Sequence, residues 1–192
     1  IPDLKKALEL SSDPEQIEKI KRQIEAIQHP EHYPEVVDLQ SAEDHNKRGA
    51  DYYLKQKYKL AIADFTKALE LDPSFSAAYH NRGLAFRDDG QYASAILDFN
   101  RTIELRPDSK AYFNRGLAYS DAGQYDLSIG DFSKAIELDN EFARAYYERS
   151  GSYYCKGEHE LSLRDMDKVI ELSDDNNLIQ LAKEAKRNME RK

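Results

Sequence analysis

The chain has 192 residues, 40% of them apolar, so it can furnish the core of one medium-sized domain or one elongated array. Its 28 basic and 36 acidic side chains leave a net charge of −8. We therefore expect no nucleic-acid partner, because phosphate binding relies on clustered Lys and Arg. The longest apolar run is Leu60–Ala63, which is too short to cross a bilayer, so no membrane insertion is expected.

The cysteine content limits the kinds of covalent and metal support available to the fold. Cys155 is the single cysteine, so neither an internal disulfide nor a cysteine zinc site can form. A reducing, cytoplasmic location is consistent with this composition. The sequence begins at Ile1, and a targeting segment could precede it.

One segment recurs four times along the chain. The clearest copies are Tyr79–Phe86 and Tyr112–Tyr119, which share the run Asn-Arg-Gly-Leu-Ala. The small residue in the middle of this segment recurs after 34, 33 and 34 residues, at Gly49, Gly83, Gly116 and Ser150. This period predicts four repeats, which cover residues 42–75, 76–108, 109–142 and 143–176.

Each repeat is predicted to form two helices, because apolar residues recur at spacings of three and four in two blocks. Gly90, Gly123 and Gly157 lie at the break and suit the left-handed conformation at a helix C-terminus. The glycine inside each first helix costs about 1 kcal/mol relative to alanine, so we expect it to permit a close helix crossing. The small residues expected opposite these glycines are Ala61, Ala95, Ser128 and Ser162.

The repeats resemble the tetratricopeptide repeat, whose unit carries an aromatic residue, Gly, Tyr, Ala, an aromatic residue, Ala and Pro in this order. The second repeat holds Tyr79, Gly83, Phe86, Ala95, Phe99, Thr102 and Pro107 at these places. The fourth repeat departs most, which is typical of a terminal repeat. The resemblance implies an all-α, right-handed superhelical solenoid of helix-turn-helix repeats.

Both ends of the chain are predicted to carry capping helices. Residues 177–192 form an amphipathic pattern that would cover the last repeat. Residues 1–41 are interpreted as the remnant of an upstream tetratricopeptide helix, a covering helix with an isoleucine stripe, and a linker that contains Pro30 and Pro34. The alternative is a degenerate N-terminal cap that belongs to this domain.

One charged pair recurs in every repeat. An arginine occupies one place in the four first helices, and an aspartate occupies one place in the four second helices. The spacing predicts an Arg–Asp ladder made of Arg48 with Asp64, Arg82 with Asp98, Arg115 with Asp131, and Arg149 with Asp165. Four unconnected, solvated charges are the alternative.

The resemblance further implies that the stacked first helices line a concave groove that receives a peptide from another protein. Side chains one residue beyond the core places are turned about 100° away from the core and should face this groove. The equivalent residues Asn81 and Asn114 carry amides that can both donate to and accept from an extended peptide backbone. The predicted groove residues are Asn46, Lys47, Tyr53, His80, Asn81, Arg87, Lys110, Phe113, Asn114, Arg144, Tyr147 and Tyr154.

Some tetratricopeptide proteins bind a C-terminal carboxylate with a clamp of Lys, Asn and further basic residues on three first helices. When the clamp is projected onto repeats one to three, only Asn81 and Lys110 fit. In repeats two to four only Asn114 and Arg144 fit, and Glu148 stands where the clamp has a basic residue. The sequence therefore disfavours such a clamp.

No catalytic, cofactor or metal site is predicted. His29 and His32 lack a third ligand, and Cys155 lacks an evident activating base. The sequence favours a non-enzymatic scaffold or adaptor that binds a peptide or protein segment. Two alternatives stay open: a self-assembly module that forms a homo-oligomer by end stacking or terminal-helix swapping, and a regulatory segment of a larger protein.

Overall fold

The computed structural model describes residues 17, 18, 20, 21 and 41–190. The chain divides into two compact units, residues 1–40 and 41–192. In the first unit the described residues are helical, and Ile20 is buried. The linker, His29 with His32, and most of the expected N-terminal covering helix lie outside the described residues.

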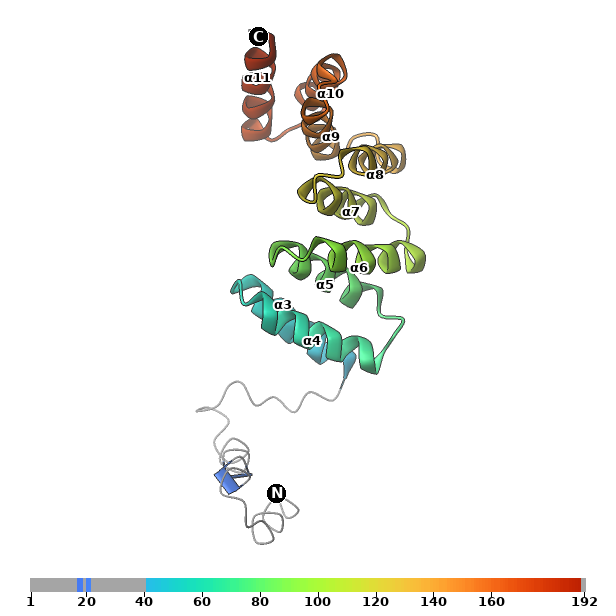
Figure 1. The fold of residues 1–192 in the computed structure, drawn as a ribbon, viewed down its shortest axis with the longest axis vertical. Helices are drawn as coiled ribbons and strands as arrows, with labels where there is room; N and C mark the ends of the chain where they lie inside the picture. The colour runs from blue at the N-terminus through green and yellow to red at the C-terminus, as the bar shows by residue number, and fades with distance from the viewer. Residues whose placement is uncertain (1–16, 19, 22–40, 191–192) are drawn as a thin grey trace. The chain divides into compact units, whose positions relative to one another are not determined.

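The second unit is built from helices alone within the described range of 41–190 (Figure 1). The first helix of each repeat begins at the first residue predicted for that repeat, which is Ala42, Ser76, Ser109 or Ala143. In chain order the helices are α3 (Ala42–Leu54), α4 (Tyr58–Leu71), α5 (Ser76–Asp88), α6 (Tyr92–Leu105), α7 (Ser109–Asp121), α8 (Tyr125–Leu138), α9 (Ala143–Cys155), α10 (His159–Leu172) and α11 (Asn176–Glu190).

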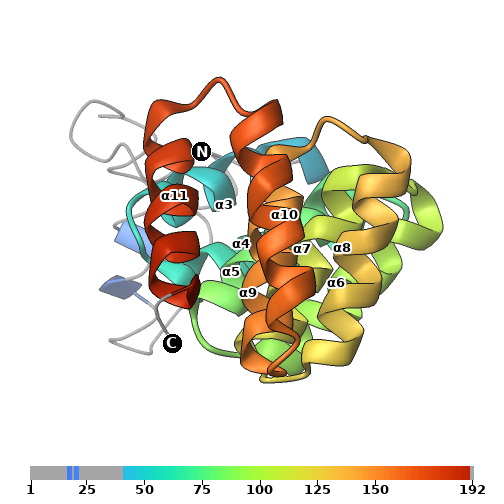
Figure 2. The same cartoon turned by 90° about the horizontal axis from the view of Figure 1, so that it is seen from above.

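The helices pack as consecutive pairs that stack along the unit. Each odd-numbered helix from α3 to α9 packs against the even-numbered helix that follows it, and each even-numbered helix packs against the next odd-numbered one. Successive first helices also contact one another, α3 with α5, α5 with α7, and α7 with α9. The last helix, α11, lies beside α10 (Figure 2). It overlaps residues 177–192, for which the sequence predicts a C-terminal capping helix.

A residue with a positive φ follows each first helix, as the glycine pattern predicts. Gly90, Gly123 and Gly157 have φ of 78°, 73° and 79°. In the first repeat the same place is held by Gln56, whose φ is 57°. A side chain with a Cβ tolerates this conformation poorly, so Gln56 marks a place where the turn dictates the backbone against the preference of the residue.

The internal glycines of the first helices do permit a close approach, but to a different residue from the one expected. A Cβ added to Gly49, Gly83 or Gly116 would come within 2.7 or 2.8 Å of the phenylalanine ring in the same repeat. The facing side chains are Phe65, Phe99 and Phe132, rather than the small residues of the second helix.

Two of those small residues, Ala61 and Ala95, serve the contact between repeats instead. Ala61 clusters with Ala85 of the next repeat, and Ala95 clusters with Ala118. All four side chains are completely buried. Their small size therefore sets the distance between neighbouring helix pairs.

The predicted Arg–Asp ladder is confirmed in all four repeats. Its ion pairs have shortest N–O distances of 2.6 or 2.7 Å, and each aspartate side chain is no more than 9% exposed. From the second repeat on, the arginine also donates to the second helix of the preceding repeat. The acceptors are Thr66 for Arg82, Asn100 for Arg115 and Ser133 for Arg149. The ladder thus fixes each repeat to its neighbour.

Candidate functional site

The candidate site is the inner face, defined here as the surface of α3, α5, α7 and α9 that carries the predicted groove residues. Each of these helices contributes three of the twelve residues. Because successive first helices contact one another, side chains at equivalent places come close together across the repeats. The structure brings four of the predicted residues together in contacts between neighbouring first helices, Asn46 with Asn81 and His80 with Asn114, and these four side chains form a polar row.

Hydrogen bonds between repeats join an asparagine of this row to an asparagine or a histidine of the preceding repeat. The Nδ2 of Asn81 donates to Oδ1 of Asn46 at 3.0 Å. One repeat further, Asn114 Nδ2 lies 3.4 Å from His80 Nε2. All four side chains are half-buried. These bonds use part of the hydrogen-bonding capacity of each amide and hold the groups in a fixed orientation.

His80 is also held by an aromatic contact beneath the row. Its ring meets Phe99 edge-on, with centroids 5.9 Å apart. Burial lowers the pKa of His80, because desolvation disfavours the charged imidazolium. The lowered pKa favours the neutral ring, whose nitrogens can donate or accept a hydrogen bond without a charge.

A second set of contacts runs along the C-terminal ends of the first helices. Tyr53 donates its hydroxyl to Oδ2 of Asp88 at 2.6 Å. Arg87 lies 2.8 Å from Asp88 and 3.7 Å from Asp121 of the next repeat. Burial raises the pKa of Tyr53 to about 12, and the hydrogen bond and charge of Asp88 act in the same direction.

Two carboxyl groups of the inner face are held in an unfavourable environment. Burial raises the pKa of Glu148, although Arg144 lies 3.7 Å away, and the charge of Asp121 raises it further. Burial also raises the pKa of Asp121, to which the charge of Asp88 adds. Burial is the main cause of both shifts, and the guanidinium groups of Arg87 and Arg144 act against it.

The remaining predicted residues differ in exposure. Lys47, Lys110, Arg144 and Tyr154 are exposed, and Tyr147 is half-buried. Exposure leaves these side chains accessible to a ligand.

Phe113 corrects the sequence expectation. It is only 7% exposed and packs against Phe132 and Phe142, with ring centroids 5.7 and 4.8 Å apart. Phe142, which precedes α9, covers the ring that was expected to face the groove. Phe113 therefore belongs to the core cluster of the third repeat rather than to the accessible inner face.

Sequence reasoning missed the acidic members of the site. Asp88 and Asp121 are the last residues of α5 and α7, so their equivalence was a signal in the sequence. Glu148 was considered only as a departure from the carboxylate clamp. The structure shows that these acids lie around Arg87 and Arg144, which were both predicted.

Residues 17, 18, 20, 21 and 41–190 contain neither a membrane-spanning helix nor a metal-binding cluster. No helix there is long and apolar enough to cross a membrane. No group of three or more His, Cys, Asp or Glu side chains there is arranged to hold a metal ion.

The stacked helix pairs and the inner face define the chain as an α-solenoid. Three family models match it: a tetratricopeptide repeat at residues 109–142, another tetratricopeptide repeat at 76–109, and a TPR repeat at 49–90. The chain is therefore a tetratricopeptide repeat protein, and its fold is the right-handed superhelix of that family. A comparison with curated proteins gave no match.

Solved structures with the same fold include a crystal structure of MamA protein, at 28% identity and a TM-score of 0.65 over 68% of this chain and 72% of MamA. The first TPR domain of Spaghetti (RPAP3), solved with the HSP90 peptide SRMEEVD, is 27% identical, with a TM-score of 0.59 over 63% of this chain and 97% of that domain. The APC/C hetero-tetramer Cut9-Hcn1 matches in fold alone, at 16% identity and a TM-score of 0.69 over 79% of this chain and 30% of that one.

Proposed function

We propose that this chain is a non-catalytic interaction scaffold that holds an extended segment of a partner protein along its inner face. The observation that carries the proposal is the row of half-buried amides and rings joined across repeats, Asn46 with Asn81 and His80 with Asn114. Asn side chains offer both donors and acceptors, so they can pair with a peptide backbone whatever its side chains are. The first TPR domain of Spaghetti (RPAP3), which has a related fold, is bound to an HSP90 peptide, and this supports a peptide as the ligand here.

The rigidity of the framework supports this proposal. The Arg–Asp ladder satisfies the buried charges on the core side, so the first helices keep their spacing when the inner face is empty. A preformed surface loses less conformational entropy on binding than one that must be ordered. Binding by such a face needs no chemistry, only an extended segment with free backbone groups.

The test uses peptides selected from a phage-displayed library of random dodecapeptides on the full chain. Replacing Asn81 and Asn114 together with Ala should weaken binding of a selected peptide about thirtyfold, since each of the two lost hydrogen bonds costs about 1 kcal/mol. The far-ultraviolet circular dichroism should not change. The matched control replaces Asn140 and Asn177, which are exposed and lie outside the inner face. Equal affinity of both double variants would contradict the proposal.

The test also addresses self-assembly. Sedimentation of the chain over a range of concentrations reports whether it forms a homo-oligomer. If the Asn81/Asn114 double variant changes the oligomeric state rather than peptide affinity, the inner face serves a second copy of the chain instead of a partner peptide.

A further inference from the structure

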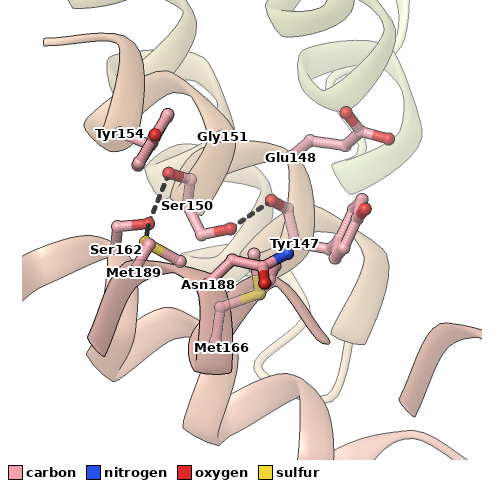
Figure 3. A pocket seen from close by; sticks show the side chains of 10 residues that line it. Tyr147, Glu148, Ser150, Gly151, Tyr154, Ser162, Met166, Asn188 and Met189 are labelled. Atoms are coloured by element: carbon pink, nitrogen blue, oxygen red, sulfur yellow. Dashed lines mark hydrogen bonds between the residues drawn. The ribbon is translucent and has the colours of Figure 1, made fainter. Parts of the chain in front are cut away.

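A pocket of about 300 Å³ lies at the end of the inner face, between α9, α10 and α11 (Figure 3). Its walls include Tyr147 and Tyr154 of α9, Met166 of α10 and Met189 of α11. The volume is at the lower end of the range of roughly 300 to 1,000 Å³ that is typical of ligand pockets.

The pocket exists because the fourth repeat lacks a side chain that the other repeats have. Gly151 lies in α9 at the place held by Ala50, Leu84 and Leu117, which pack against core clusters of the first three repeats. A Cβ at Gly151 would meet no atom within 4 Å. The space that a leucine fills in the second and third repeats is therefore open here.

The lining is suited to an apolar side chain of variable shape. Met166 is 5% exposed and is part of the core cluster that receives α11, while Met189 packs against this cluster from α11. Methionine side chains are flexible and polarisable, so they adjust to different guests. Tyr154, which is 38% exposed, adds an accessible aromatic wall.

The charged groups beside the pocket indicate which kind of residue should lie next to the apolar side chain in the bound segment. Glu148 lines the pocket, and the charges of Asp121 and Arg87 both act on it. Arg87 lies closer to Asp88 than to Asp121, at 2.8 against 3.7 Å, and Arg144 lies 3.7 Å from Glu148. Three carboxyl groups thus share two guanidinium groups, so a further cation is electrostatically favoured here.

We propose that this pocket anchors a Leu or Met side chain of the partner segment, and that a Lys or Arg next to it in the segment pairs with Glu148 and Asp121. This inference rests on the proposed function and names the chemistry of its ligand. A basic residue flanking an apolar anchor matches the excess of carboxyl groups, whereas an acidic segment would meet like charge.

The experiment uses the same selected dodecapeptides on the full chain, with binding measured by fluorescence anisotropy. The selected sequences should carry Leu or Met beside Lys or Arg. Gly151→Leu restores the side chain of the second and third repeats and should weaken binding by about tenfold or more, because burial of the anchor is lost. Gly130→Leu is the matched control, since Gly130 is also an exposed helix glycine with open space around it, but in α8. Its affinity should equal that of the unaltered chain.

The charge requirement has its own test. Glu148→Gln should weaken binding of a selected peptide several-fold, and the effect should disappear when the basic residue of the peptide is replaced with Ala. If Glu148→Gln weakens both peptides equally, the carboxylate does not pair with that residue and the proposal fails.

The outcomes separate this inference from the proposed function. Peptides that respond to the Asn81/Asn114 double variant but not to Gly151→Leu would overturn the pocket and leave the function standing. Peptides that respond to neither would overturn both. If Gly151→Leu dissociates a dimer seen by sedimentation, a second copy occupies the pocket and the proposal of a partner side chain is wrong.

Discussion

Arg115 of α7 donates to Asp131 of α8 through two nitrogens, Nε to Oδ2 at 2.7 Å and Nη2 to Oδ1 at 2.6 Å. Its third nitrogen, Nη1, donates to Asn100 of the preceding repeat at 2.7 Å. The guanidinium carbon also lies 5.6 and 5.8 Å from the ring centroids of Tyr112 and Tyr119. One side chain therefore couples the charge pairing of its own repeat to the neighbouring one.

Arg115→Met should destabilise the fold by about 2 to 3 kcal/mol in urea unfolding, because it leaves Asp131 buried without a counter-charge. The double variant Arg115→Met with Asp131→Leu should lose less than the sum of the two single variants, since no charge is left uncompensated. Arg101→Met is the control, because Arg101 pairs with Glu104 on the exposed surface and should change stability little. Additive single and double variants would show that the pair is not coupled.

The internal glycine of the third repeat predicts a second effect on stability. In Gly116→Ala, the new Cβ would lie 2.7 Å from Cε1 of Phe132, so the ring or the helix must move. Overpacking should outweigh the gain in helix propensity and cost about 1 to 2 kcal/mol in urea unfolding. Gly130→Ala in α8 meets no neighbour and should instead stabilise by up to about 1 kcal/mol. Higher stability of both Gly116→Ala and Gly130→Ala would contradict the close approach of Gly116 to Phe132.

Much of this architecture could be predicted from the sequence because the same contact recurs in each of the four repeats. The ladder and the helix pairs follow from residues that recur every 33 or 34 positions. The inner face is less predictable where a residue acts only once. Phe113 is buried because Phe142 happens to cover it, and the terminal pocket needs both Gly151 and the placement of α11. Such single contacts between separate segments have no periodic signal.

The turn of the first repeat offers a substitution that should stabilise the fold. Gln56 has φ of 57° at the place where later repeats have glycine. Gln56→Gly should therefore raise the free energy of unfolding by about 1 kcal/mol, because glycine relieves the left-handed strain. The reverse change, Gly123→Ala at φ of 73°, should lower it by about the same amount. Thermal unfolding of the two variants measures both changes in stability. A lower stability of Gln56→Gly would show that the backbone of Gln56 is not strained.

Glu148 and Asp121 predict how stability depends on pH. Their ordinary pKa values of 4.5 and 3.8 are raised in the folded protein, chiefly by burial. A carboxyl group whose folded pKa is raised contributes stability that is fully present below the ordinary value and is lost as the pH rises through the folded value. At neutral pH the ionised groups therefore cost stability.

Glu148→Gln should accordingly raise the urea midpoint at pH 7, because the neutral amide removes a half-buried charge, and the gain should shrink as the pH approaches 4. Glu137→Gln is a suitable control, since Glu137 is exposed and pairs with Lys134, so no comparable gain at neutral pH is expected. A lower midpoint for Glu148→Gln at pH 7 would mean that its pairing with Arg144 outweighs its burial. A higher midpoint would instead show that the ionised Glu148 lowers the stability of the fold. A carboxylate that is unfavourable in the unbound chain is what a site for a cationic group requires.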